Sequence, residues 1–211
     1  MTNQPLMVHL DCNFRKARFI MIRLTELVEF NSGTPQFRIR ESLDADAPVY
    51  YYYGRSEMDV DLTGVEVWNS NKRQIRTSDG VATLISGDLV LSLITGKAAI
   101  VRDSHNRYLY TQNYVKLAPV SEVDTAYLAY ILNENADIKQ QMLSSQQGSE
   151  TLKFTLKQLR NLLIPTPPLI KKQRIIGELY SNQLRLAALK KRVAATETKL
   201  ILRKLREANK S

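Results

Sequence analysis

The residue types that carry out catalysis or bind metal ions are scarce in this sequence. His9 and His105 are its only histidines and Cys12 is its only cysteine, so no metal-ligand spacing can be built from them. Lys97 follows Gly96, but a phosphate-binding loop would need its first glycine at position 91, which is a leucine. The sequence therefore predicts no metal site, no cofactor and no catalytic residue, and it favours a protein that is not an enzyme.

Positive charge is concentrated at the end of the chain. Residues 1–150 contain 15 Lys+Arg and 18 Asp+Glu, whereas residues 151–211 contain 15 Lys+Arg and 3 Asp+Glu. The net charge of +9 therefore arises in the second segment. Such a basic block suits nucleic acid, a membrane surface or an acidic protein, and a solvated helix face is the alternative.

Features of targeting and redox chemistry favour a cytoplasmic location. The single cysteine cannot form an internal disulfide, which fits a reducing compartment. There is no apolar run long enough to cross a membrane, and the first residues lack the pattern of a secretory signal.

A proline-rich segment divides the sequence into two parts. Pro165, Pro167 and Pro168 prevent a helix from running through, whereas Pro168 suits the first turn of a new helix. The pattern after it predicts one basic helix to about Ala208, about 60 Å long at 1.5 Å per residue. We therefore expect a globular domain at residues 1–165 and a long helical arm at residues 166–211.

The globular part is predicted to contain a sheet and then helices, which places the fold in the α/β (α+β) class. Residues 17–30 fit either a strand or a short helix followed by a strand. Further strands are expected at residues 49–53, 65–68, 83–85, 88–94, 98–102 and 108–117, in one irregular sheet of roughly six or more strands. Helices are expected after Asp124, over residues 138–143, and from a Thr155 cap to Asn161.

Apolar residues recur every seven positions along the long helix. They are Leu179, Leu186, Val193 and Leu200, with Tyr180, Ala187, Ala194 and Ile201 beside them. Polar Gln183, Lys190 and Glu197 interrupt the pattern, and such residues can specify register. A lone helix cannot bury such a stripe, so we expect a partner helix, with packing on its own globule as the alternative.

Several ordered segments carry a family resemblance: Leu24–Pro35, Gly87–Val90, Tyr110–Asn113, Tyr127–Leu132, Gly148–Ser149 and Leu162–Ile176. In the last, Ile164-Pro165-x-Pro167-Pro168 precedes a helix that has Gln173 about one turn later. Together the segments resemble a target recognition domain and conserved helix of specificity subunits from type I restriction-modification systems. Lys172 departs from the pattern, since many relatives have an acidic residue there.

The resemblance implies a mixed-sheet globule that reads DNA and a long helix that pairs in an antiparallel coiled coil. Full-length relatives carry two such units in tandem, and this sequence contains one. It implies a homodimer or a pairing with a different specificity chain, in a complex with methyltransferase and restriction subunits that supply the chemistry. The alternatives are a coiled-coil adaptor without DNA specificity, a fragment of a fused restriction-methylation enzyme, and a helix lying on a membrane surface.

If the resemblance holds, residues in turn-rich segments read the DNA. Arginine, lysine and amide side chains are the groups that grip phosphate and read base edges. The candidates are Thr34, Gln36, Arg38, Arg40, Arg55, Asn69, Asn71, Lys72, Arg73, Arg76, Lys97 and Arg107. The run Tyr50–Tyr53 favours a place in the core over a stacking surface. The basic helix clusters at 191–192 and 203–206 favour contacts with methyltransferase subunits, with DNA phosphate as the alternative.

Overall fold

In the described part of the chain, short strands and four helices precede a fifth helix, which forms the long arm. The structure is a computed structural model that describes residues 20–66, 72–120, 122–146 and 153–210. Its strands are β1 (Met21–Arg23), β2 (Val28–Ser32), β3 (Val49–Tyr51), β4 (Gln74–Arg76), β5 (Leu89–Ser92), β6 (Ala98–Ile100), β7 (Tyr114–Pro119) and β8 (Leu163–Pro165). Its helices are α1 (Arg55–Thr63), α2 (Thr125–Glu134), α3 (Ala136–Gln146), α4 (Leu156–Arg160) and α5 (Ile170–Ala208). Single 3-10 turns are η1 (Leu24–Glu26), η2 (Gln36–Arg38) and η3 (Asp103–His105).

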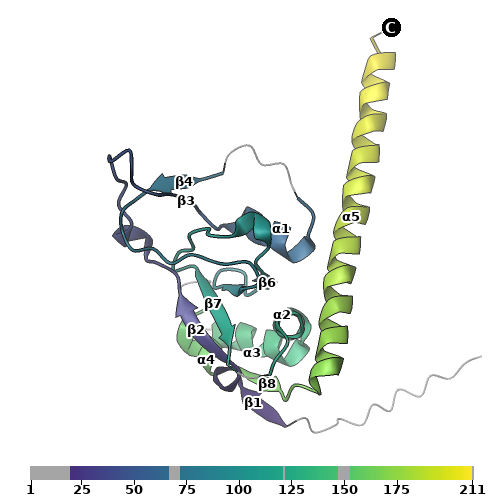
Figure 1. Cartoon of the computed structure of the whole chain (residues 1–211). Helices are drawn as coiled ribbons and strands as arrows, with labels where there is room; N and C mark the ends of the chain where they lie inside the picture. Colours follow the sequence, from purple (N-terminus) through teal and green to yellow (C-terminus); the bar gives the residue numbers. More distant parts are fainter. Residues whose placement is uncertain (1–19, 67–71, 121, 147–152, 211) are drawn as a thin grey trace, which may run out of the picture.

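The strands form three sheets instead of the one sheet that was expected. A four-stranded sheet has the order β2-β7-β5-β6, while β1 pairs with β8 and β3 pairs with β4. The named strands of the described residues pair antiparallel, and parallel pairing occurs at isolated bridges such as Tyr52 with Leu109. β1 and β8 bring the two ends of the globular part together at the base of α5 (Figure 1).

One expected strand is shorter than predicted, and another is reduced to a single bridge. Within residues 108–117 only the part from Tyr114 is a strand, since Arg107 has a φ of 63° and the following residues make single bridges. Thr83 likewise makes one bridge, with Leu109. For the strand expected at 65–68, Val65 and Glu66 are irregular, and 67–68 lie outside the described residues.

Helix α1 was not expected from the sequence. Gly54 lies at its N-cap, and the Glu57 carboxylate accepts a hydrogen bond from the Gly54 N–H at 3.0 Å. Gly64 ends the helix with a φ of 64°, a conformation that glycine adopts without strain. The helix carries few apolar residues, so its ends are marked by caps and its middle gives little periodic signal.

The predicted helix caps of the globule are confirmed. The Asp124 carboxylate accepts a hydrogen bond from the Tyr127 N–H at 2.9 Å at the start of α2. The Thr155 hydroxyl accepts one from the Gln158 N–H at 3.2 Å at the start of α4. α2 then packs on the central sheet, where the Asn133 amide hydrogen-bonds both backbone groups of Ala98. These contacts fix the surface on which α5 docks.

Helix α5 begins at Ile170, two residues later than Pro168, and it packs against α2 near its start. Gln173 and Gly177 are its buried residues. A Cβ on Gly177 would lie 2.6 Å from the Tyr127 backbone nitrogen, so glycine permits the close approach of the two helices. Beyond this region the helix extends away from the globule (Figure 1).

Candidate nucleic-acid interface

Most of the predicted DNA-binding residues lie at the end of the globule that is farthest from the start of α5. Lys72, Arg73 and Arg76 lie on or beside β4, and the loop 33–48 packs next to them (Figure 1). This loop carries Thr34, Gln36, Arg38 and Arg40. Two further candidates, Asn69 and Asn71, lie outside the described residues.

The two cations that precede β4 are each held by a tyrosine. The Lys72 ammonium donates a hydrogen bond to the Tyr108 hydroxyl at 2.9 Å, and this bond raises the pKa of Lys72. The Arg73 guanidinium lies over the Tyr52 ring, 4.4 Å from its centroid. Both side chains remain exposed, so each presents a positive charge to solvent from a restrained position.

The loop 33–48 is anchored at both ends to the rest of the globule. Gly33 lies so close to Thr111 that a Cβ would approach the Thr111 carbonyl oxygen to 2.3 Å. The Thr34 hydroxyl accepts a hydrogen bond from the Ala82 N–H at 2.7 Å, and the Arg40 N–H donates to Asp79 at 2.7 Å. Thr34 is therefore engaged in holding the loop, while Gln36 and Arg38 stay exposed on it.

Arg76 closes the loop from the strand side. Its guanidinium donates to the carbonyl oxygens of Ala45 and Ala47, the second at 3.0 Å. Because the group is half-buried and already paired, its role in the free protein is to fix the loop against β4.

A buried polar cluster positions the turn that carries Arg107. The Asp61 carboxylate lies 2.8 Å from His105 Nδ1 and accepts a hydrogen bond from the Tyr53 hydroxyl at 2.8 Å. Burial, then the charge of Asp61, raises the pKa of Tyr53. Asp61 belongs to α1 and His105 to η3, so the cluster ties α1, which starts with Arg55, to the turn that presents Arg107.

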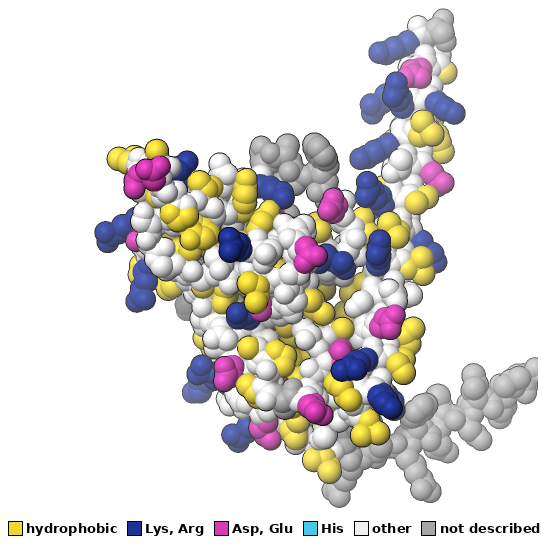
Figure 2. Space-filling view, viewed as in Figure 1, with side chains coloured by type: hydrophobic (Ala, Val, Ile, Leu, Met, Phe, Trp, Pro, Cys, Tyr) yellow, Lys and Arg dark blue, Asp and Glu magenta, His cyan; other side chains and the backbone are white. Residues whose placement is uncertain are grey.

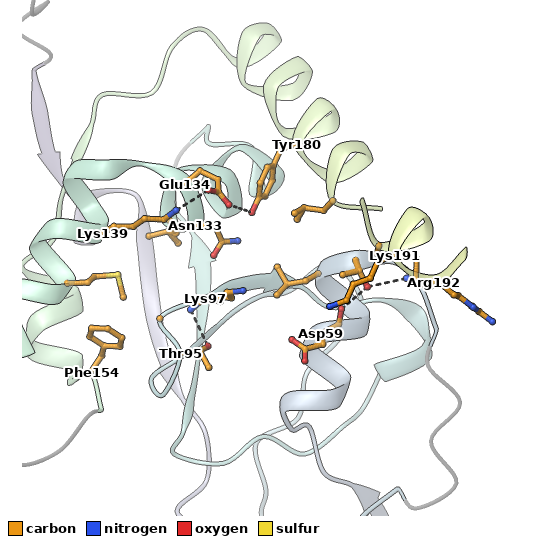
Figure 3. Close-up of a pocket in the computed structure, with 18 of the residues that line it drawn as sticks. Asp59, Thr95, Lys97, Asn133, Glu134, Lys139, Phe154, Tyr180, Lys191 and Arg192 are labelled. Carbon is orange, nitrogen blue, oxygen red and sulfur yellow. Dashed lines mark hydrogen bonds and ion pairs between the residues drawn. The ribbon is translucent and has the colours of Figure 1, made fainter. Parts of the chain in front are cut away.

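Lys97 lies apart from the other candidates. It lines a cavity of about 970 Å³ between the globule and α5 (Figure 3). The apolar part of the lining includes Leu132, Phe154 and Leu184, and Lys191 and Arg192 reach its rim from α5. Lys97 is therefore placed beside the helical arm, away from β4.

The apolar stripe of α5 is largely exposed. Leu179, Leu186, Val193 and Leu200 are 45–64% exposed, and Ala187, Ala194 and Ile201 are also exposed. Tyr180 differs, because its ring packs 5.4 Å from that of Tyr130 and its hydroxyl donates to Glu134 at 3.2 Å. Lys and Arg side chains surround the exposed apolar groups along the upper part of the helix (Figure 2).

Several exposed residues were not among the DNA-binding residues predicted from the sequence. Tyr51 is 41% exposed although Tyr52 and Tyr53 are buried, and Gln74 is exposed on the neighbouring strand. Phe37 is 77% exposed on η2. The available signal for Tyr51 was its place next to Tyr50 in a predicted strand, since side chains of a strand alternate between faces and Tyr50 packs inward.

Two other features are absent from the described ranges. No group of three or more His, Cys, Asp or Glu side chains there is arranged to hold a metal ion. Within those same ranges no helix combines the length and apolar character needed to cross a membrane.

Comparison with solved structures shows a shared fold. The HsdS subunit of Thermoanaerobacter tengcongensis matches with a TM-score of 0.54 at 19% identity, over 88% of this chain and 42% of that one. A chain from a study of complex assembly and conformational transition of the type I R-M system matches with a TM-score of 0.56 at 20% identity, over 92% of this chain and 45% of that one. The type I restriction-modification S subunit of M. genitalium matches with a TM-score of 0.50 at 15% identity, over 88% of this chain and 44% of that one.

The family model agrees with the structural comparison. This chain spans less than half the length of each of these three structures. Comparison with curated protein sequences gives no significant match. The type I restriction modification DNA specificity domain matches residues 19–196, which is most of the sequence, and the chain therefore belongs to this family.

Proposed function

We propose that this chain is a sequence-specific DNA-recognition subunit of a type I restriction-modification complex. In this role it directs a methyltransferase and a nuclease-translocase to a bipartite DNA site and has no catalytic activity of its own. The observation that carries the proposal is the family match over residues 19–196. The grouping of Lys72, Arg73 and the loop 33–48 at one end of the globule supports it, because exposed cations grip DNA phosphate.

The proposal assigns different roles to the two parts of the chain. Residues 1–165 form the recognition domain, and residues 166–211 form the arm that sets spacing, dimerises and docks the methyltransferase. The exposed apolar groups of α5 support this division, since a stripe without a partner costs free energy in water. Two identical chains joined through α5 as an antiparallel pair would form an isologous dimer, and the DNA site would then contain two inverted half-sites.

The experiment is to express this chain with its methyltransferase subunit in a host and to map methylated bases over the genome. A motif of two inverted half-sites around a fixed gap is the expected result. An asymmetric split motif would keep the recognition role and replace the homodimer by a pair of different specificity chains. No new methylation, with both proteins soluble, would overturn the proposal and favour an adaptor without DNA specificity.

Salt dependence provides an independent check on purified protein. Binding through phosphate contacts releases counterions, so log K falls with log salt with a slope of about −0.9 per phosphate neutralised on duplex DNA. A slope near zero would contradict a DNA interface built from the cations beside β4.

A further inference from the structure

The β3–β4 ribbon has one side that packs inward. Tyr50 and Ile75 lie opposite each other in the register of the two strands. Both pack against the buried residues Ile39, Tyr52 and Leu109. Because side chains alternate between the two faces of a strand, the residues on either side of this pair face outward.

The outward side carries groups that suit the edges of bases. Tyr51 lies opposite Gln74, and Val49 lies opposite Arg76. Val49 is 43% exposed and Tyr51 is 41% exposed. Gln74 is also exposed, and its amide has no hydrogen-bond partner among the residues that the structure describes. An amide without a partner, next to apolar groups, leaves two donor hydrogens and an acceptor oxygen free for a ligand.

The ribbon is held in place, so its outward side is presented in a fixed geometry. The Tyr51 carbonyl accepts a hydrogen bond from the Leu109 N–H at 2.8 Å. The Tyr51 ring stacks on the Tyr108 ring with centroids 5.5 Å apart. The Arg76 guanidinium fixes the other end of the ribbon to the Ala47 carbonyl at 3.0 Å. A surface fixed in this way loses little conformational entropy when it binds.

Charge distinguishes the two ends of the ribbon. Lys72 and Arg73 precede Gln74, so the end that carries the free amide is basic. The loop that Arg76 holds at the other end contains Arg38 and Arg40 together with Glu41, Asp44 and Asp46, so its charges nearly cancel. A polyanion therefore approaches the Gln74 end, with phosphate beside the two cations and base edges in front of the amide.

We propose that the outward side of the β3–β4 ribbon enters the major groove and that the Gln74 amide reads an adenine in each half-site. Two strands about 4.8 Å apart fit a groove about 12 Å wide. A glutamine amide binds the N6 amino group and N7 of adenine through two hydrogen bonds. This inference rests on the proposed function and assigns base recognition to a residue within it.

The test uses the full-length chain after its methylation motif has been mapped. Gln74→Ala is compared with Gln140→Ala, which removes another exposed amide, from α3. We expect the Gln74 variant to relax one A·T position of each half-site by roughly 10-fold or more in relative affinity. The other positions of the motif and the thermal midpoint stay unchanged, and the Gln140 variant behaves as the wild type.

Modified oligonucleotides identify the contact itself. Single adenines of the motif are replaced by 7-deazaadenine, which lacks the N7 acceptor. The wild type should lose affinity at one adenine, and the Gln74 variant should be insensitive to replacement at that same adenine.

Three results would overturn the inference: a motif without a required A·T pair in each half-site, an unchanged motif in the Gln74 variant, or equal weakening on every sequence. Equal weakening is the behaviour of a phosphate contact. Failure of the proposed function is distinct from all three, because the wild type would then select no motif at all.

Discussion

The two halves of α5 carry the same seven-residue apolar spacing, but the globule covers side chains of the proximal half alone. In the proximal half, residues 170–192, Gln173 and Gly177 are buried against the globule, and the Arg192 guanidinium makes a last contact with the Glu66 carbonyl at 3.3 Å. In the distal half, residues 193–208, every side chain is exposed. Helix formation propagates easily once started, so the docked half supports the projecting one.

This difference shows how one amphipathic pattern divides between internal and external contacts. The proximal half uses a small residue and an amide to approach α2 closely. The distal half keeps Leu200, Ile201 and Leu205 in solvent at 53–60% exposure. A run of exposed apolar groups at this density is typical of an interaction surface, and the proposed dimer would form there.

The strongest disruption of the docked half is expected from Gly177→Leu. The nearest atoms to a new Cβ are the Tyr127 nitrogen and Ala126, all at 2.6–2.8 Å, and backbone atoms cannot move aside. We expect the free energy of unfolding to fall by about 3 kcal/mol, the upper part of the range for overpacking. Urea denaturation followed by circular dichroism measures it.

Gly177→Ala is a smaller change that can be measured if Gly177→Leu does not fold. Alanine in place of glycine normally stabilises the interior of a helix by up to about 1 kcal/mol. At this position the clash of the new Cβ with α2 outweighs that gain, so Gly177→Ala should lower the free energy of unfolding. A stabilised Gly177→Ala variant would show that α5 does not dock as described.

In the distal half, Leu200→Asp should weaken dimerisation and leave the stability of the folded chain almost unchanged. Loss of a buried leucine from a dimer seam costs about 2 kcal/mol, or roughly 30-fold in the dimer Kd. Light scattering over a dilution series measures this shift. Leu202→Asp, about 200° around the helix from Leu200 and outside the named stripe, is the matched control and should leave association unchanged. Equal weakening by both variants would indicate a general charge effect and no defined seam.

A buried amide in the proximal half provides a smaller effect with a close control. The Gln173 side chain accepts from the Asp124 N–H at 2.9 Å and donates to the Pro168 carbonyl at 2.7 Å. Gln173→Ala leaves these groups without partners, so we expect a loss of about 1–3 kcal/mol. Gln183→Ala, on an exposed face of the same helix, should change stability by less than about 0.5 kcal/mol. Equal effects of the two changes would mean that helix propensity, and no docking contact, sets the stability.

The features of the fold that could be predicted from the sequence are those that follow local rules. The prolines and the seven-residue spacing of Leu179 to Leu200 depend on local rules, so the long helix was predicted to within two residues at its start. Helix α1 was missed because its caps at Gly54 and Gly64 mark its ends while its short middle lacks an apolar stripe. Local rules thus identify long periodic elements better than short capped ones.

The candidate interface depended more on tertiary contacts. Lys72 and Arg73 were expected in a turn-rich segment, and they lie beside β4, a strand that was not expected. Lys97 lies apart from them, in the turn between β5 and β6. Whether Tyr51 and Gln74 face outward is fixed by the register of β3 with β4. That register depends on distant anchors such as Leu109, which no local pattern reveals.

The smallest expected effect concerns Tyr180, at the edge of the docked half. Its ring packs against Tyr130, and its hydroxyl bonds the exposed Glu134. At neutral pH, Tyr180→Phe should cost less than about 1 kcal/mol, since an exposed hydrogen bond exchanges with water. Tyr180→Ala should cost more, because the ring contact is lost as well.

The pH dependence of this variant separates burial from hydrogen bonding. Burial raises the pKa of Tyr180 to about 12 from its ordinary value of 10.0, and the nearby Glu134 charge adds to the rise. Between these values the unfolded phenol has lost its proton while the folded one retains it, so this contribution to stability is lost as the pH rises from 10.0 through about 12. Tyr180→Phe has no proton to lose at this position. The difference in the free energy of unfolding between the variant and the wild type should therefore shift in favour of the variant over this range. Parallel stability curves for the two proteins at alkaline pH would mean that Tyr180 is solvated, and that the docked half ends before it.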